Sequence, residues 1–327
     1  MRRSHLDLLA CPTCVGPLTL TTEDGDRVQR GSLTCHTCAR RVPIVGGIPR
    51  FVPLDNYAAS FGFEWLKHAR TQYDRDSGSR ISETRFFDET GWPRVMPGEL
   101  VLEVGGGSGR FTEHALTTGA TVVSVDYSVA VEANYASNGE HENLLIVQAD
   151  LYRLPFRPKT FDRLYCFGVL QHTPDVPKAF RQLPPMVRQG GHLVVDVYRR
   201  HAGLKQLLNT RYWVRPITRR LPPALLYRLV QAYVRVMWPV AVALHQVPVL
   251  GRRLVSALLI PDYRGVHDLP EPIRRDWAVL DLFDMLSPRF DQPQTLETVE
   301  EWFGEAGLRE IDVRYGYNGI QARAITA

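Results

Sequence analysis

The stretch that decides the fold is Leu102-Glu-Val-Gly-Gly-Gly-Ser-Gly-Arg-Phe111, in which four glycines fall within five positions directly after a short apolar run. Glycine is costly to order, so it is kept where a side chain would obstruct an approach to the backbone. The flanking pattern predicts a strand over Leu100–Val104 and a helix over Phe111–Thr118. We therefore expect a strand–loop–helix unit whose glycine backbone is approached closely by a ligand.

Alternating apolar runs and helical patterns extend from this unit to residue 198. They predict a parallel sheet with right-handed crossovers, which is an α/β fold. The last two apolar runs, 308–314 and 319–325, are joined by a turn too short for a helix, which predicts an antiparallel last strand. The other predicted strands are Thr121–Val125, Leu144–Gln148, Arg163–Phe167 and His192–Tyr198, and the other predicted helices are Val129–Asn138, Val176–Arg188 and Thr295–Ala306.

Two nucleoside-containing cofactors compete for the glycine loop. A dinucleotide fingerprint, Gly-x-Gly-x-x-Gly, needs a third glycine next to the helix N-terminus that binds the pyrophosphate. Counting from Gly105 puts that position on Arg110, and counting from Gly107 puts it on Thr112. An NAD-dependent oxidoreductase is therefore disfavoured. The spacing present is an acid followed by three alternate glycines: Glu103, Gly105, Gly107 and Gly109.

This spacing resembles the first motif of class I S-adenosyl-L-methionine (SAM) methyltransferases of the type 11 group. In that family the glycines let the backbone approach the cofactor, and the acid helps to anchor its methionine end. The resemblance covers residues 90–198 and 295–326. It implies methyl transfer and a Rossmann-like seven-stranded sheet with an antiparallel last strand. Family members usually carry cysteine where this chain has Gly106, so the loop has lost one small side chain.

Three further segments resemble later motifs of the same group. Residues 122–126 resemble the second motif, which implies that Asp126 accepts hydrogen bonds from both ribose hydroxyls, a task that suits a carboxylate. Residues 148–151 resemble the third motif, which implies that Asp150 or the following amide holds the adenine amino group. Residues 154–175 resemble the surroundings of the fourth strand. The implied cofactor site consists of Glu103, Gly105, Gly107, Gly109, Asp126, Tyr127, Asp150, Leu151 and Gly168.

Methyl transfer asks the protein mainly to bring an acceptor and a sulfonium methyl group together. A base is needed only where the acceptor must lose a proton. His172 follows the fourth strand, where the acceptor is expected, and is the first candidate for that base or for acceptor contact. A histidine that only caps a helix or lines the cofactor site stays open as the alternative. Asp196 and Tyr198 are weaker candidates, and Cys166 is expected to be a buried strand residue.

Four of the five cysteines form two Cys-x-x-Cys pairs, Cys11 with Cys14 and Cys35 with Cys38. Two such pairs predict a Zn²⁺ site whose four thiolates complete the coordination shell, so the metal is structural. A module of about 50 residues has too small a core to be stable without such help. A redox-active pair is the alternative, which the spacing disfavours. Residues 6–51 resemble the Trm112-like zinc-ribbon family, whose free-standing members bind and stabilise methyltransferases.

Composition separates further zones of the chain. Residues 54–92 are rich in aromatic side chains and resemble a cofactor-capping segment, although packing in the core would also explain them. Residues 199–264 carry twelve Lys and Arg against one acid, while the whole chain has a formal net charge of +4. The predicted domains are 1–53 (zinc ribbon), 54–92 (linker and capping helices), 93–198 (SAM-binding core), 199–290 (basic helical insertion over the acceptor) and 291–327 (C-terminal helix and strand pair).

The basic insertion has several interpretations. The simplest is a helical lid with a solvated basic face. The alternatives are contact with an anionic membrane surface, an anionic small-molecule acceptor and RNA, which ranks lower because most interleaved aromatics have helical core spacing. The segment after residue 280 resembles the ending of the same methyltransferase group. This implies acceptor-facing positions at Asp281, Asp284, Ser287, Arg289 and Phe290.

The sequence has no recognisable secretory leader and no run of about 18 apolar residues, so we expect a cytoplasmic protein in which paired cysteines bind metal. The predicted function is SAM-dependent methyl transfer to a small molecule, lipid-linked or a secondary metabolite. An RNA or protein acceptor is the alternative. A non-catalytic SAM-binding module is a hypothesis from a different class.

Overall fold

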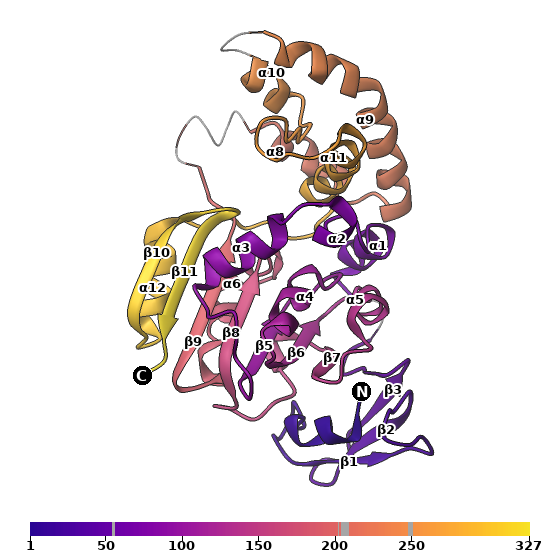
Figure 1. The fold of residues 1–327 in the computed structure, drawn as a ribbon, viewed down its shortest axis with the longest axis vertical. Helices are drawn as coiled ribbons and strands as arrows, with labels where there is room; N and C mark the ends of the chain where they lie inside the picture. The colour runs from indigo at the N-terminus through magenta and orange to yellow at the C-terminus, as the bar shows by residue number, and fades with distance from the viewer. Residues whose placement is uncertain (54–55, 202, 204–208, 248–250) are drawn as a thin grey trace.

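The computed structural model describes residues 1–53, 56–201, 203, 209–247 and 251–327. Figure 1 shows an N-terminal ribbon at one end of the molecule, a central sheet flanked by helices, and a helical cap at the other end. The cap, formed by residues 209–247 and 251–286, belongs to the predicted basic insertion. Lys205 of that insertion lies outside the described residues, as do the side chains of Arg252 and Arg253.

The central sheet has seven strands in the order β10-β11-β9-β8-β5-β6-β7. Strands β5 to β9 pair in parallel, whereas β11 runs antiparallel to both β9 and β10. The predicted α/β sheet with an antiparallel last strand is therefore confirmed. The strands are β5 (Leu100–Val104), β6 (Thr121–Asp126), β7 (Leu144–Gln148), β8 (Phe161–Phe167), β9 (Val187–Val197), β10 (Arg309–Gly316) and β11 (Gly319–Ile325).

Helices cover both faces of this sheet, and alternation along β5 explains why. Leu102 and Val104 join one apolar core with α6 and α12, whereas Val101 joins a second core with α3 and α4. Successive side chains of a strand point to opposite faces, and a parallel strand is buried on both. The covering helices are α3 (Ile81–Thr90), α4 (Arg110–Thr117), α5 (Val131–Asn138), α6 (Val176–Phe180) and α12 (Leu296–Glu305).

The helix predicted over residues 176–188 is wrong beyond Phe180. Helix α6 ends there, and the 3₁₀ helix η4 (Pro184–Met186) precedes β9, which begins at Val187 rather than at the predicted His192. The two adjacent prolines of η4 have no N–H groups to donate within an α-helix and clash with the preceding turn. The periodic apolar pattern across this segment therefore belongs to a short helix, a turn and a long strand.

The ribbon is a four-stranded antiparallel sheet that shares its apolar core with the central sheet. Leu33, Val42 and Phe51 lie in the same buried cluster as Leu145 and Val147 of β7. The ribbon is thus packed against the β7 edge of the central sheet, as Figure 1 shows. Its elements are η1 (Arg3–Leu8), β1 (Leu18–Thr21), β2 (Arg30–Cys35), β3 (Arg41–Val45) and β4 (Ile48–Pro49).

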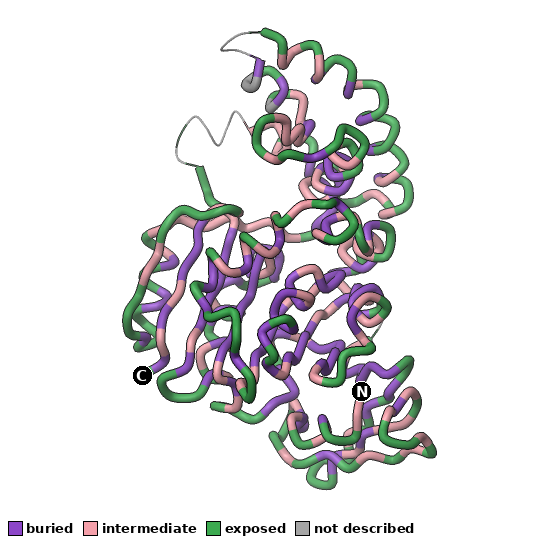
Figure 2. Tube along the Cα trace, viewed as in Figure 1, coloured by how far each residue is buried: buried purple, intermediate pink, exposed green. Residues whose placement is uncertain are grey.

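The cap has a core of its own. Leu226, Val230 and Val234 recur along one face of α9 and pack with Phe283 of α11, while Phe63 of α1 lies against this cluster. In Figure 2 the outer side of α9 is largely exposed and its inner side is buried. The cap therefore rests on α1. The helices of the cap are α8 (Arg211–Thr218), α9 (Pro223–His245), α10 (Gly251–Ala257) and α11 (Glu271–Leu286). The two helices that precede α3 in the chain are α1 (Ala59–Lys67) and α2 (Asp74–Ser77).

Candidate functional site

A cavity of about 300 Å³ lies between the carboxyl edge of the sheet, α1 and the cap. Ligands of open parallel sheets bind outside the carboxyl ends of the strands, and clefts and cavities of this size bind small molecules. The glycine loop, the ends of β6, β8 and β9, the aromatic face of α1, and α11 with the segment before it form its walls. None of its lining residues comes from the ribbon, as far as the chain is described.

The glycine loop lines the cavity through Gly105 and Gly107. Gly105 has a φ of +84°, and a Cβ there would lie 2.0 Å from Cγ2 of Val169. The Gly107 N–H donates to Oδ2 of Asp126 at 2.9 Å. The loop is therefore closed against the next strand, and its backbone is exposed to the cavity in a way that side chains would prevent.

The small side chain that the loop has lost at Gly106 leaves no gap in the structure. A Cβ at this position would lie 2.2 Å from Oγ of Ser124 and 3.0 Å from Oε2 of Glu103. The space that a side chain would need is filled by the Ser124 hydroxyl. The Ser124 hydroxyl of β6 therefore takes the place of the side chain that the family pattern has at this position.

Two of the predicted cofactor residues lie behind the loop rather than on the cavity wall. Glu103 is buried and accepts a hydrogen bond from the Thr112 hydroxyl, and burial raises the pKa of its carboxyl. Gly109 precedes α4 with a φ of +93°, and a Cβ there would lie 2.2 Å from Oδ1 of Asn134. Both residues fix the loop against α4 and α5.

Asp126, at the end of β6, faces the cavity with its carboxylate held in place. Besides the Gly107 N–H, it accepts the Ser128 N–H at 2.8 Å and the Ser128 hydroxyl at 2.7 Å, both at Oδ1. A carboxylate has about four acceptor positions, so Oδ2 retains capacity for another donor. Burial raises the pKa of this carboxyl.

An aromatic pair lies beside the cavity, with one tyrosine directly after β6 and the other shortly before α1. Tyr57 and Tyr127 have ring centroids 4.7 Å apart, and both line the cavity together with Leu151. Asp150 does not line it, because its side chain accepts the Tyr152 N–H at 2.9 Å and caps the 3₁₀ helix η2 (Leu151–Arg153). Of the third motif, Leu151 reaches the cavity and the acidic side chain does not.

His172 ends the 3₁₀ helix η3 (Leu170–His172) and lines the cavity. Its Nδ1 lies 3.0 Å from the Phe290 carbonyl oxygen. Because a carbonyl can only accept, Nδ1 carries the proton, and in the neutral ring Nε2 holds a lone pair. Nε2 is buried and has no hydrogen-bond partner among the described residues. The imidazole is therefore oriented with an unused acceptor at the cavity.

Two arginines on the cavity wall, Arg85 and Arg110, were not predicted from the sequence. Arg85 of α3 pairs with Glu89 at 2.8 Å and with Asp196, which in turn accepts the Gly168 N–H. Arg110 follows Gly109 directly, so its place beside the loop could have been expected from the motif. It has no carboxylate partner within 4.0 Å in the described chain, and burial together with Arg85 lowers its pKa to about 10.

The cap side of the cavity is acidic, not basic. Asp281 accepts from the Tyr263 hydroxyl, Asp284 accepts from the Tyr198 hydroxyl at 2.9 Å, and both line the cavity. Burial raises the pKa of Asp281 to about 7. The residues predicted beside them, Ser287, Arg289 and Phe290, do not line the described cavity, although the Phe290 carbonyl orients His172.

The arginines of the insertion lie elsewhere. Among the lining residues that the structure describes, the cap contributes no Lys or Arg, so an anionic acceptor finds no support in this wall. Arg215 is buried and donates to the carbonyls of Met285 and Pro288. Contact of the outer face of α9 with an anionic membrane surface stays a prediction; that face exposes Leu225, Leu229, Val236 and Val240 beside Arg228 and Arg235.

No helix within the described ranges has both the length and the apolar composition needed to cross a membrane.

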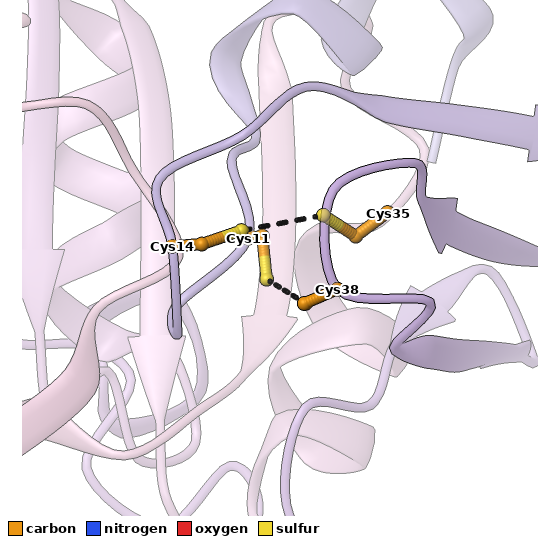
Figure 3. A group of neighbouring side chains, drawn as sticks. All are labelled: Cys11, Cys14, Cys35 and Cys38. Carbon is orange, nitrogen blue, oxygen red and sulfur yellow. Dashed lines mark hydrogen bonds between the residues drawn. The ribbon is translucent and has the colours of Figure 1, made fainter.

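The four predicted cysteine ligands come together as Figure 3 shows, one pair from the loop before β1 and the other at the end of β2. Their four sulfur atoms lie within 4.8 Å of one another, with Cys11 to Cys38 at 3.5 Å and Cys14 to Cys35 at 3.4 Å. A tetrahedral Zn²⁺ with Zn–S bonds of about 2.3 Å has S–S edges of roughly 3.8 Å. The donor set and its spacing fit this ion.

Comparison with known proteins agrees with this arrangement. Residues 102–195 match the methyltransferase domain family, and residues 2–47 match the Trm112p-like protein family. Two separate parts of the chain thus match a methyltransferase domain and a Trm112p-like protein. Demethylmenaquinone methyltransferase of Thermobifida fusca is 32% identical over 101 residues, which are 30% of this chain and 43% of that protein. Sterol 24-C-methyltransferase ERG6B of Gibberella zeae is 30% identical over 115 residues, which are 32% of this chain and 30% of that protein.

The chain thus spans less than half the length of either curated relative. Among solved structures, the complex of the Haloferax volcanii Trm112 methyltransferase activator with a methyltransferase resembles it at 12% identity and a TM-score of 0.43. That match covers 81% of this chain and 97% of the other.

Proposed function

We propose that this protein is a SAM-dependent methyltransferase that methylates a small molecule in the cavity between the sheet and the cap. The observation that carries the proposal is the convergence of the glycine loop, Asp126 and His172 on one cavity to which the cap also contributes a wall. A loop that serves packing alone would not need its backbone exposed to a cavity beside an oriented carboxylate and an oriented imidazole.

The residues present fit the parts of SAM. Oδ2 of Asp126 would accept from the ribose, and the tyrosine pair of Tyr57 and Tyr127 would flank the adenine beside Leu151. The partly exposed backbone of Gly105 and Gly168, with the buried Gly107 behind it, would allow the close approach of the methionine part. Arg110, a cation without a carboxylate partner in the described chain, would hold the cofactor carboxylate. When bound, SAM would supply an electrophilic methyl group.

His172 is the proposed base. The Phe290 carbonyl holds the proton on Nδ1, so Nε2 can accept a proton from the acceptor. Aromatic side chains from α1 and the cap, Phe61, Trp65 and Trp277, surround the cavity and would keep water away from the reacting groups. Positioning and proton removal are the two tasks that the chain itself performs.

A small acceptor is supported by the shape and the charge of the site. The cavity is covered by α1 and α11, and the charged side chains that the cap presents to it are Asp281 and Asp284. An acidic wall disfavours a nucleic acid, whose binding rests on contacts between basic residues and phosphates. The names of the two curated relatives also specify small molecules, a demethylmenaquinone and a sterol. Zn²⁺ held by the four cysteines would stabilise the ribbon, outside the cavity.

The test is transfer of a labelled methyl group from SAM into cell extract, followed by size fractionation. We expect the label in the low-molecular-weight fraction. A His172→Asn variant, whose amide can still donate to the Phe290 carbonyl, should transfer at least about 100-fold more slowly while it binds SAM normally. A matched exposed change, Glu305→Gln on α12, should have no effect. Label in RNA or protein would replace the small acceptor, and SAM binding without any transfer would indicate a non-catalytic module.

A further inference from the structure

Glu64 on α1 is the most unusual charged group of the cavity wall. Its side chain is 0% exposed, it lines the cavity, and neither carboxylate oxygen has a hydrogen-bond partner in the described part of the chain. Buried polar atoms in native proteins are almost always paired, because a buried unpaired carboxyl loses its hydration without compensation. A group left in this state on a cavity wall points to a partner that binds there.

Two more carboxyls share this wall. Burial and the charges of Asp284 and Asp281 raise the pKa of Glu64 well above its ordinary value, so the three acids interact electrostatically. Arg110 reaches Asp281 only through Gln72, which accepts from the guanidinium at 2.5 Å and donates to Asp281 at 3.4 Å. Arg85 also acts on Asp281 but is already paired with Glu89 and Asp196. A bound cation would favour the ionised forms of Glu64 and Asp281, whose pKa values are raised without it.

The surroundings favour an organic cation over a metal ion. Among the described residues, the group whose ligand atoms could hold a metal ion is the four cysteines, and Glu64, Asp281 and Asp284 are not part of such a group. Aromatic rings line the same space, among them Trp65, Tyr198 and Trp277. Carboxylates interleaved with aromatic faces bind ammonium groups through charge-assisted hydrogen bonds and cation–π contact.

We propose that the acceptor is an amine, which binds in its ammonium form to Glu64 together with Asp281 and Asp284. Because an ammonium nitrogen has no lone pair, Nε2 of His172 would first take one N–H proton. The freed lone pair would then form the new N–C bond as the bond between the methyl carbon and the sulfur breaks, and S-adenosylhomocysteine would leave. This inference rests on the proposed methyl transfer and narrows its substrate class. The cationic group lies next to the proposed base, because the Tyr198 ring that donates to Asp284 is 5.2 Å from the His172 ring. Arg110 is available for the cofactor carboxylate, and Gln72, which bonds to both groups, separates its guanidinium from Asp281 on the acceptor side.

The experiment uses the full chain, zinc-loaded and saturated with S-adenosylhomocysteine, whose binding is first measured by calorimetry. The probes are sets of fragments on aromatic and aliphatic scaffolds, each made as an amine, an alcohol and a carboxylate, and their binding is measured by ligand-observed NMR. In the wild type and in Glu305→Gln we expect the amines to bind about tenfold more tightly than their alcohols. In Glu64→Gln and Asp284→Asn that preference should fall to less than about twofold, with unchanged S-adenosylhomocysteine affinity.

Three results would overturn the inference. Amines that bind no better than their alcohols would remove it, and this includes the case in which no fragment binds. A Glu64→Gln protein that loses S-adenosylhomocysteine affinity but keeps the amine preference would assign Glu64 to the cofactor. Absence of S-adenosylhomocysteine binding in the wild type would remove the proposed function and this inference with it, whereas binding without amine preference removes the inference alone.

Discussion

The ribbon and the cap are both additions to the same sheet, but they differ in how they are attached and in what they reach. The ribbon shares its apolar core with β7 and lines no part of the described cavity. The cap has a separate core and provides Asp281 and Asp284 to the cavity. The difference suggests a division of tasks, in which the ribbon supports the sheet and the cap defines the acceptor.

The ribbon nevertheless reaches the cofactor side through one chain of contacts. Arg50 pairs with Glu132 of α5 at 3.0 Å and donates to the Gln148 side chain at 3.0 Å. The Gln148 amide in turn donates to the Tyr127 carbonyl at 3.2 Å, and Tyr127 lines the cavity. The ribbon therefore contacts Gln148, which in turn bonds to Tyr127 of the proposed adenine site.

Among the changes that test this comparison, removal of the metal should lower the stability of the protein most. Without Zn²⁺ the thiolates of Cys11, Cys14, Cys35 and Cys38 lose the bond that offsets the small ribbon core, and structural zinc contributes on the order of 10 kcal/mol to such modules. Because the ribbon core continues into β7, we expect Cys35→Ser or a strong chelator to unfold ribbon and sheet in one transition at lower temperature. Calorimetry checks this, with zinc content as the control. A separate early transition that leaves the sheet melting unchanged would contradict the shared core.

The glycine loop offers a smaller and sharper test on the cofactor side. Gly106→Ala puts a methyl group 2.2 Å from the Ser124 hydroxyl, and overpacking of this kind costs about 1–3 kcal/mol. We expect a lower melting temperature and weaker SAM binding, both restored when Ser124→Gly is added. A Gly106→Ala protein that binds SAM normally without the second change would show that the loop is looser than its contacts imply.

The smallest expected effect lies on the acceptor side and depends on pH. Glu64 faces Asp281 and Asp284 of α11 and Tyr227 of α9, and its folded pKa is raised well above 4.5. A raised carboxyl pKa means that the folded state binds the proton more tightly, so its contribution to stability is complete below pH 4.5 and is lost as the pH rises. The glutamine in Glu64→Gln cannot ionise, so this variant does not lose stability in this way. Its melting temperature should exceed that of the wild type by an amount that grows from pH 5 to pH 8. Glu305→Gln should track the wild type, and a Glu64→Gln difference independent of pH would contradict the raised pKa.

The sequence predicted the sheet well because parallel strands leave strong signals. The apolar runs of β5, β6 and β7 match the predicted strands to within one residue, and the four cysteines met as their spacing required. The extent of α6 was wrong, since apolar periodicity outweighed the adjacent prolines of η4. A local sequence pattern predicts a helix or strand correctly when the burial and the backbone hydrogen bonding of that segment agree with the pattern.

The acceptor half of the site could not be predicted in the same way. Glu64 lies in an aromatic helix with no motif around it, and its importance comes from contacts with residues more than two hundred positions later. The net basic charge of the insertion left a solvated basic face and several anionic partners open, because charge counts do not say which face of a helix each side chain occupies. Arg215 donates to backbone carbonyls and lies near Asp291, and Arg264 pairs with Asp262. Asp281 and Asp284, in contrast, line the cavity.

The most direct test of the central claim is calorimetric titration of SAM into the zinc-loaded protein, beside Asp126→Ala and the matched surface change Asp312→Asn. Asp312 lies on β10 and pairs with Arg323, away from the cavity. The account predicts saturable binding to the wild type and to Asp312→Asn, and at least about 50-fold weaker binding to Asp126→Ala, because the loop and the ribose would lose the same carboxylate. Equal affinity in all three proteins, or no binding to the wild type, would contradict it.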